Sequence, residues 1–272
     1  MATLSQINIY PIKSMAGFEV SNVYVSKTGL SYDRQMMLID TKGKFVTARK
    51  LPRLLSFAVV LHESGTVIKA PSGSSLKINN DDFKSNVSVN IWRHDMSALV
   101  DNDDINKWLS TELELDVRLV RLSEDSQRTV SNSFQALAFS DGYPLLIIGE
   151  ESLELLNKKA SESSLMSQFR SNLVFSGDQP FIEDTWRRIK IGDVEFEFVK
   201  PCERCIMTTV DMSTFNFRKS KEPLQTLAKF RADERGRLMF GENLIAKNEG
   251  IISLGDKIEI LETHESIHYG VK

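Results

Sequence analysis

The chain has few of the residues that build metal cages or disulfide frameworks: two cysteines and four histidines in 272 residues. Two cysteines cannot form a disulfide framework, and their Cys-x-x-Cys spacing suits a reducing compartment better than a secreted one. No second Cys-x-x-Cys occurs, so a structural zinc site, which takes four ligands, lacks partners. His264 and His268 have helical ligand spacing but lie almost sixty residues downstream of Cys205.

Long apolar runs and nucleotide motifs are also missing. No run approaches the roughly 18–20 apolar residues that span a membrane. The start, residues 1–6, has neither the basic nor the apolar region of a secretory signal. The net charge of -3, from 34 basic and 37 acidic side chains, argues against a general nucleic-acid binder. No glycine-rich nucleotide motif or Walker sequence is present. We therefore expect a cytoplasmic protein without membrane or nucleic-acid partners.

What the chain does have is a long succession of short strands. Apolar residues at 41% and charged residues at 26% are ordinary for a globular protein. Alternating or β-branched segments bounded by turn residues predict strands at 7–10, 20–25, 36–39, 45–49, 56–61, 66–70, 75–78, 86–92, 117–120, 143–148, 172–175, 188–191, 195–199, 206–210 and 257–261. Helical spacing predicts helices at 101–113, 150–159 and 223–230. The sequence thus predicts a β-rich α+β fold, with a barrel or sandwich in its first third.

Both cysteines fall in one stretch, Cys202-Glu203-Arg204-Cys205, ahead of the predicted strand 206–210. The positive charge of Arg204 and Lys200 favours the thiolate, which is the form that binds soft metals. A thioredoxin-like redox pair should instead open a helix after a strand. Two merely buried cysteines remain a third interpretation, so the stretch alone indicates a reactive or metal-binding thiol without deciding between them.

Basic residues stand at several predicted turns or strand ends. Lys13-Ser14, Asp33-Arg34 and Thr47-Ala48-Arg49 are each, taken singly, ordinary solvated groups. Together they could form a pocket for a phosphate, because arginine offers bidentate geometry. A further arginine occurs in Arg170-Ser171-Asn172.

Other polar and aromatic residues carry weaker signals. Asp141 is an Asx-type turn former ahead of a strand. The three tryptophans, Trp92, Trp108 and Trp186, are interpreted as core residues.

These pieces, in this order, resemble the MOSC family. Tyr10-Pro11-Ile12-Lys13-Ser14, Tyr32-Asp33-Arg34 and Val46-Thr47-Ala48-Arg49 resemble the β-barrel domain that precedes MOSC domains. Further motifs resemble the MOSC domain itself and lie at 140–144, 169–172, 202–211, 221–224 and 241–243. The resemblance implies an N-terminal β-barrel domain at 1–95, a MOSC domain at 96–262 and a tail at 263–272.

Within the family, the pattern is most similar to the amidoxime-reducing branch, whose members reduce N-hydroxylated compounds at a molybdenum cofactor (molybdopterin). The resemblance implies that Cys205 ligates molybdenum and that Asp141 lies near the metal. The residues that match cofactor-facing positions are Lys13, Ser14, Arg34, Thr47, Arg49, Arg170, Asn172 and Arg204.

The reaction so implied converts a substrate N–OH, two electrons and two protons into N–H and water. The chain lacks the four-cysteine set of an iron–sulfur cluster, so we expect a separate electron donor of the ferredoxin or flavin-reductase type. Two alternatives stay open: a MOSC protein that carries molybdopterin or sulfur without turnover, and a plain interaction module. Pyridoxal phosphate binding is a further family-level possibility.

Overall fold

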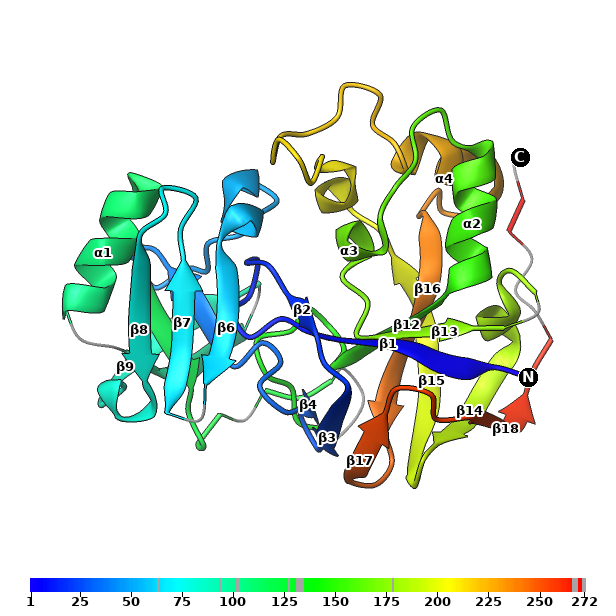
Figure 1. Cartoon of the computed structure of the whole chain (residues 1–272), viewed down its shortest axis with the longest axis horizontal. Helices are drawn as coiled ribbons and strands as arrows, with labels where there is room; N and C mark the ends of the chain where they lie inside the picture. The colour runs from blue at the N-terminus through cyan, green and yellow to red at the C-terminus, as the bar shows by residue number, and fades with distance from the viewer. Residues whose placement is uncertain are drawn as a thin grey trace. The chain divides into compact units, whose positions relative to one another are not determined.

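The computed structural model of the chain describes residues 1–62, 64–92, 94–100, 103–126, 128–130, 135–177, 179–265 and 269–270. Its contacts divide the chain into two compact units (Figure 1). Unit 1 consists of Met1–Asn8, Glu19–Ser31 and Tyr143–Lys272, and unit 2 of Ile9–Phe18 and Tyr32–Gly142. The predicted domain boundary at residue 95 stays a prediction. In the described part of the chain, no helix is both long and apolar enough to cross a membrane.

An eight-stranded sheet forms the centre of unit 1. Its strands, in spatial order, are β18 (Ile258–Thr263), β14 (Trp186–Ile191), β15 (Val194–Glu203), β16 (Met239–Ala246), β12 (Leu145–Gly149), β13 (Leu173–Ser176), β1 (Thr3–Ile9) and β2 (Phe18–Glu19). β12 and β13 pair in parallel, and α2 (Glu150–Lys159) and α3 (Met166–Phe169) lie between them in sequence. A parallel pair needs such a crossover, and every residue of β12 is buried. A smaller sheet contains β17 (Gly250–Ser253), β3 (Asn22–Ser26) and β4 (Gly29–Leu30).

The helices of unit 1 cover an apolar core. Figure 1 shows α2 and α4 (Leu224–Phe230) side by side, as their contacts require. Beneath them, Phe169 and Phe240 stack with ring centroids 4.6 Å apart, within a buried cluster that also contains Leu156. Cys202 packs against this cluster at the end of β15. Its side chain therefore contributes to packing.

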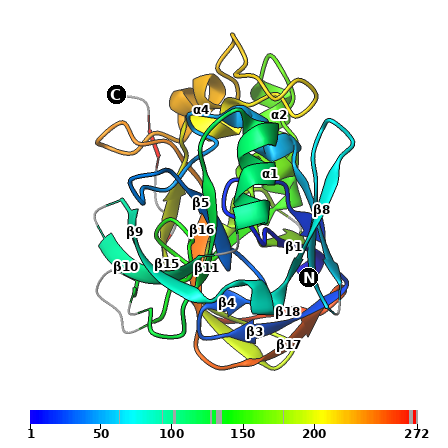
Figure 2. The same ribbon diagram turned by 90° about the vertical axis from the view of Figure 1, so that its left-hand side faces the viewer.

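Unit 2 contains two smaller sheets. One has the order β5 (Met36–Ile39), β11 (Arg118–Leu122), β10 (His94–Val100) and β9 (Ser85–Ile91), and the other joins β6 (Ala58–His62), β7 (Gly65–Lys69) and β8 (Ser75–Asn79). Figure 2 shows β9, β10 and β11 as neighbours, with α1 (Asp103–Leu113) nearby. α1 buries Ile105, Leu109 and Leu113, which recur at helical spacing and contact β11. Residues 101 and 102, included in the predicted helix, lie outside the described residues.

The β-rich α+β prediction is confirmed, but two predicted strands are wrong. Within residues 45–49 only Phe45 forms a β-bridge, to Ile39, and the chain then turns. The Thr47 carbonyl accepts from the amides of Lys50 and Leu51 in that turn. Residues 206–209 form a 3₁₀ turn, η4 (Ile206–Thr209). The hydroxyls of Thr208 and Thr209 donate back to the carbonyls of Cys205 and Ile206. β-Branched threonines here satisfy the backbone locally and do not build a sheet.

Among the described strands, five were not predicted: the two-residue strands β2 and β4, and the longer strands β10, β16 and β17. β16 reads Met-Phe-Gly-Glu-Asn-Leu-Ile-Ala, and its central Gly, Glu and Asn are residues depleted from strands. Tertiary pairing with β12 and β15 on both sides supplies what the local propensity lacks. Most of its side chains are buried, Glu242 included.

Glu242 belongs to a buried acid cluster in unit 1, which we define as Glu183, Asp184, Glu242, Arg231 and Tyr269. Arg231 forms a two-pronged ion pair with Asp184, at 2.5 and 3.0 Å, and both side chains are almost fully buried. The Arg231 guanidinium also lies 4.0 Å from the ring centre of Tyr269. The predicted loose tail is therefore fixed at Tyr269, whereas residues 266–268 and 271–272, His268 among them, lie outside the described residues.

Candidate functional site

In unit 2, three of the predicted site residues meet at one carboxylate. Lys13 Nζ lies 2.5 Å from Oδ1 of Asp141, and Arg49 Nη2 lies 2.7 Å from Oδ2. Lys13 also donates to the carbonyl of Phe139 at 2.7 Å. Lys13 is 7% exposed, whereas 45% of the Asp141 side chain is exposed. Residues more than ninety positions apart in sequence thus form one cluster, the Asp141 cluster, with an accessible carboxylate.

Two further members of the Asp141 cluster were not identified from the sequence. Arg128 donates to the carbonyls of Ala138 at 2.7 Å and Ser140 at 2.6 Å, and also to that of Asp141. It therefore holds the segment that carries the carboxylate. Arg128 is only 7% exposed, although the sequence analysis assigned neither a strand nor a helix to the segment around it.

Trp92 is the second. Its Nε1 lies 3.3 Å from Asp141 Oδ1, and the Arg49 guanidinium lies 4.6 Å from its ring centre. With 47% of its surface exposed, Trp92 is not the core residue that the sequence analysis expected. Trp186, at 1%, is a core residue as predicted.

Arg34, Ser14 and Thr47 lie in the same unit with different partners. Arg34 pairs with Asp33 at 2.5 Å and lies over the ring of Tyr10, 4.7 Å from its centre. Ser14 is almost buried, and the Thr47 hydroxyl accepts from the backbone amide of Arg49 at 3.3 Å. Thr47 thus shapes the turn that carries Arg49. The assignment of all three as cofactor-binding residues stays a prediction.

The electrostatics of the Asp141 cluster follow from its excess of cations. Burial lowers the pKa of the Lys13 ammonium to about 8, opposed by Asp141 and reinforced by Arg128 and Arg34. Burial by itself would raise the pKa of Asp141, but Lys13 and Arg49 outweigh it and hold that pKa well below its usual range. Asp141 is therefore ionised at any physiological pH. Counted together with the neighbouring Asp33–Arg34 pair, the cluster has more cations than carboxylates. The cations are Lys13, Arg34, Arg49 and Arg128, and the carboxylates are Asp33 and Asp141. The excess of positive charge suits an anionic ligand.

In unit 1, the cysteine stretch is built around Arg204. Its Nη1 donates to Cys202 Sγ at 3.1 Å, and its Nη2 donates to the carbonyl of Phe169 at 2.6 Å. Its Nε is buried and has no hydrogen-bond partner among the described residues. Both cysteines are partly exposed, and no disulfide joins them in the described chain. The arginine thus contacts Cys202, and its unsatisfied Nε suits a further acceptor.

Cys205 is held in place by its neighbours on η4. Gln168, from α3, donates to the carbonyls of Thr208 at 2.8 Å and Val210 at 3.0 Å. The Thr208 hydroxyl donates to the carbonyl of Cys205 at 2.9 Å. Gln168 is buried and was not identified from the sequence, because a glutamine two residues before Arg170 carries no signal of its own. These bonds fix a partly exposed thiol on a rigid turn.

Arg170 and Asn172 follow α3. Arg170 is 7% exposed and caps α3 in the left-handed conformation, with φ of 55°. Asn172 is 1% exposed, and its amide nitrogen Nδ2 donates to the carbonyl of Asn8 at 3.2 Å. The backbone of Asn172 pairs with Leu146 and Asn8. Asn172 therefore has a structural role between β1, β12 and β13, and its predicted contact with a cofactor stays a prediction.

Left-handed backbone occurs at several of these residues. Ser14, Arg34, Trp92 and Arg170 have φ values of 70°, 50°, 57° and 55°. Such conformations cost about 1–3 kcal/mol in residues other than glycine and gather at functional sites, where the surroundings enforce them. Three of the four were predicted as cofactor-binding residues, and Trp92 is the fourth.

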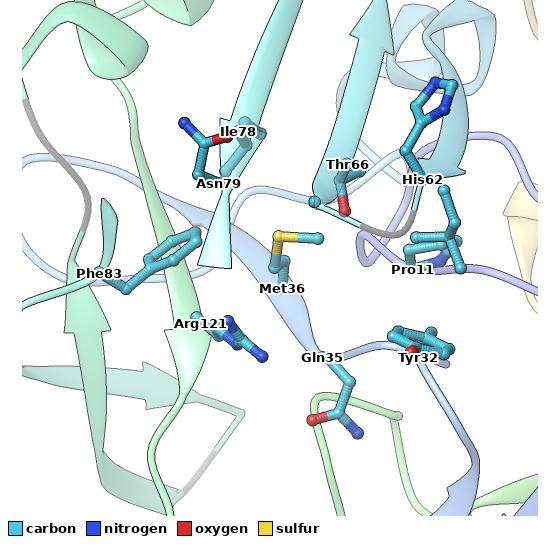
Figure 3. Close-up of a pocket in the computed structure, with 12 residues that line it drawn as sticks. Pro11, Tyr32, Gln35, Met36, His62, Thr66, Ile78, Asn79, Phe83 and Arg121 are labelled. Carbon is cyan, nitrogen blue, oxygen red and sulfur yellow. The ribbon is translucent and has the colours of Figure 1, made fainter. Parts of the chain in front are cut away.

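Unit 2 also has a pocket elsewhere, drawn in Figure 3. Met36 lies at its centre, with Phe83, Arg121 and Tyr32 among the residues around it. None of the predicted site residues lines it. The pocket is therefore separate in composition from the Asp141 cluster.

The residues of each unit suit part of a molybdenum cofactor, which combines sulfur donors with an anionic phosphate. In unit 1, Cys205 offers one partly exposed sulfur beside Arg204, and a metal whose other donors come with the cofactor needs a single protein thiolate. In unit 2, the positive charge in excess around Asp141 suits a phosphate. The buried and unpartnered Arg204 Nε suits an anionic acceptor as well. The donor chemistry fits the group in each unit taken by itself.

Comparisons with known proteins identify the family of this chain. Residues 1–116 match the family described as the MOSC N-terminal beta barrel domain, and residues 135–259 match the MOSC domain. Mitochondrial amidoxime-reducing component 1 from Mus musculus is 32% identical over 96% of this chain and 83% of its own length. Mitochondrial amidoxime reducing component 2 from Bos taurus is 30% identical over 95% and 83%.

A plant protein is similar at the same level over a smaller share of its length. Molybdenum cofactor sulfurase from Arabidopsis thaliana is 30% identical over 88% of this chain, which spans 32% of that protein. The names of these relatives refer to amidoxime reduction or to the molybdenum cofactor. The chain belongs to the MOSC family, with a MOSC N-terminal β-barrel domain followed by a MOSC domain.

Proposed function

We propose that the chain is a molybdenum-cofactor oxidoreductase that reduces N-hydroxylated compounds, with electrons from a separate redox protein. The observation that carries the proposal is the partly exposed Cys205 on a turn fixed by Gln168, in a chain 32% identical to an amidoxime-reducing component. The net reaction takes R–NH–OH, two electrons and two protons to R–NH₂ and water. The bound cofactor supplies the two-electron redox chemistry, and the protein supplies ligation, orientation and charge.

The chain's own residues have distinct tasks in this proposal. Cys205 provides the protein ligand, and Arg204 lies beside it in sequence with a buried Nε left for an anionic acceptor. Lys13 and Arg49, with Arg34 and Arg170, bind anionic parts of the cofactor. Asp141, ionised and partly exposed, orients Lys13 and Arg49 and accepts hydrogen bonds from a ligand. We propose that the protein acts in the cytoplasm and takes its electrons from a ferredoxin or flavin-reductase type of donor.

The metal content tests the proposal directly. Protein made in a host that produces the cofactor is expected to contain about one molybdenum per chain by mass spectrometry, as one cysteine ligand implies. Cys205→Ser is expected to lose the metal, because a serine hydroxyl is a hard and weakly acidic ligand. The matched control is Cys202→Ser, which changes the neighbouring cysteine. Cys202 is also partly exposed, and this variant should retain the metal. Molybdenum retained in Cys205→Ser would contradict the proposal.

A carrier of molybdopterin or sulfur is the second candidate, and the similarity to a molybdenum cofactor sulfurase favours it. The same thiol and the same basic residues would serve a carrier. Turnover separates the two: the oxidoreductase reduces an amidoxime with an artificial electron donor, whereas a carrier binds the cofactor tightly and leaves the amidoxime unchanged. Cys205→Ser should abolish this turnover in the first case.

A further inference from the structure

The pocket of Figure 3 is built from two sheets of unit 2. One wall is a row of cross-strand neighbours, in which Thr66 of β7 pairs with Leu61 of β6 and with Ile78 of β8. A second wall contains Met36 of β5 and Arg121 of β11, which are also paired. Paired side chains lie on the same face of a sheet. The two sheets therefore line one hollow, of about 520 Å³ with its open mouth included (Figure 3).

Met36 and Arg121 face away from the apolar core of their own sheet. Successive side chains of a strand alternate between its two faces. The adjacent residues, Met37 and Val120, belong to a buried apolar cluster on one face. Met36 and Arg121 consequently lie on the other face, where the Arg121 guanidinium lies over the ring of Phe83, 5.9 Å from its centre. The strand register thus places a cation beside the apolar side chains of the pocket.

The hydroxyl of Thr66 is not used by the protein. Thr66 is 6% exposed, and its hydroxyl has no hydrogen-bond partner in the part of the chain that the structure describes. Figure 3 shows the hydroxyl oxygen on the side of Met36, at the centre of the pocket. A nearly buried hydroxyl without a partner costs stability, and a valine of the same shape would avoid that cost. The hydroxyl therefore suits a polar atom of a bound molecule.

The charge of the pocket selects the kind of molecule. Among the described residues that line it, none is an aspartate or a glutamate, and Arg121 carries the permanent positive charge. A guanidinium binds one carboxylate through two parallel hydrogen bonds, and its five N–H groups can serve a ligand beside partners from the protein. A phosphate dianion would leave one negative charge without a cation. The apolar side chains around Arg121 favour an apolar body on the ligand.

We infer that this pocket is a binding site for a small apolar monocarboxylate. Arg121 binds the carboxylate, Thr66 offers it a hydrogen bond, and Met36, Ile78 and Phe83 contact the apolar body. None of these residues is assigned to the cofactor, and the binding needs no molybdenum. The inference can therefore fail while the proposed function holds, and the reverse.

Three soluble probes separate the charge from the apolar body. Hexanoate has both, hexanamide has the same chain without the charge, and acetate has the charge without the chain. The full chain, labelled with ¹³C at its methionine methyl groups, is titrated by nuclear magnetic resonance, and Met36→Leu identifies the Met36 signal. Hexanoate should shift that signal to saturation. It should bind at least about tenfold more tightly than hexanamide or acetate, since each lacks one of the two contributions.

Substitutions in the two walls test the assigned roles. Arg121→Met retains an apolar stem and removes the charge, so it should weaken hexanoate about tenfold and leave hexanamide within about twofold. Arg118→Met is the matched control, because Arg118 lies on the opposite face of the same strand, and it should bind both probes as wild type does. Thr66→Val should weaken hexanoate about threefold and raise the melting temperature, because it removes a hydroxyl without a partner.

The contrary outcomes are equally plain. Equal affinity of the wild-type chain for hexanoate and hexanamide would overturn the inference, as would an unchanged hexanoate affinity in Arg121→Met. Saturable shifts at other methionines without one at Met36 would place the acid elsewhere and also overturn it. If Arg121→Met does not fold, Thr66→Val and the comparison of probes on the wild-type chain still decide.

Discussion

The two units contain charge clusters of opposite composition. In unit 2, cations surround the Asp141 carboxylate, whereas in unit 1 the Arg231 guanidinium pairs with Asp184, and Asp184 acts in turn on the carboxyl groups of Glu183 and Glu242. Burial disfavours the charged form of a carboxyl group in both, so it would raise both pKa values. Lys13 and Arg49 reverse that effect at Asp141. At Glu242, burial and the neighbouring Asp184 and Glu183 act together and raise the pKa to about 9.

The comparison separates a cluster open to ligands from one closed around itself. The Asp141 side chain is 45% exposed and ionised, and its cations keep charge to spare for an anion. Glu242 is 4% exposed and neutral near pH 7, so its carboxyl group can donate a hydrogen bond to Asp184. Glu183 has a pKa raised to about 7, mainly by burial and by Asp184. The acid cluster therefore holds protons, whereas the Asp141 cluster has an excess of positive charge, for which we propose an anionic ligand.

Removal of Arg231 should have the largest effect. Arg231→Met leaves Asp184 as an unpaired buried charge, so the free energy of unfolding is expected to fall by about 3–5 kcal/mol. Urea unfolding at pH 7 measures it. Arg237→Met is the matched control, because Arg237 pairs with Asp233 nearer the surface, with 42% of the Arg237 side chain exposed, and its removal should change the stability little. A loss below about 1 kcal/mol for Arg231→Met would show that the acid cluster does not depend on its cation.

The pH dependence of stability should reveal the proton on Glu242. Because its pKa is raised on folding from 4.5 to about 9, its stabilising contribution is complete below about 4.5 and is lost as the pH rises to about 9. Between pH 7 and 9, above the pKa of Glu183, the loss should be about 1 kcal/mol per pH unit. Glu242→Gln keeps a donor to Asp184 and removes the titration.

The measurement is the free energy of unfolding of wild type and Glu242→Gln at several pH values from 7 to 9. The stability of wild type relative to the variant should decline across this window. Glu259→Gln, on exposed β18, is the control and should follow wild type in parallel. Parallel curves for wild type and Glu242→Gln would contradict a neutral Glu242.

A smaller effect is expected at the open cluster. Asp141→Asn removes the anionic partner of the buried Lys13 Nζ, which should cost about 1 kcal/mol, since the carboxylate is partly exposed. The pKa of Lys13 should fall below about 8, because Asp141 is the group that opposes the effect of burial. Thermal unfolding and a nuclear magnetic resonance titration of the Lys13 side chain measure the two. Asp125→Asn, in an exposed turn, is the control, and an unchanged Lys13 pKa would refute the coupling.

Sequence patterns predicted the fold class and much of the local structure. α2 occupies the predicted residues 150–159, because its leucines recur at helical spacing. The predicted strand at 206–210 failed, because hydroxyl-to-backbone bonds within a turn are invisible to a strand propensity. The strand β16 was not predicted, because its centre is charged and polar. It forms nevertheless, because pairing with β12 and β15 on both sides outweighs its composition.

The candidate site was predictable only in part. Lys13, Arg49 and Asp141 were named from motif resemblance, and unit 2 brings them into contact. Arg128 and Gln168 act through backbone carbonyls, and such bonds leave no pattern in residue type. Trp92 was assigned to the core, because the sequence does not reveal how exposed a side chain next to an apolar strand is.

By itself, the sequence determined that the chain is strand-rich and which family it resembles. Residue types and their spacing set those properties. Tertiary structure alone decided which charged groups come into contact. Lys13 and Asp141 are 128 positions apart in the sequence, and Arg231 and Asp184 are 47 positions apart. It thereby decided that one carboxyl group is ionised and another is neutral. The physical reason is that a pKa depends on burial and on neighbours within a few ångströms, which only the folded chain supplies.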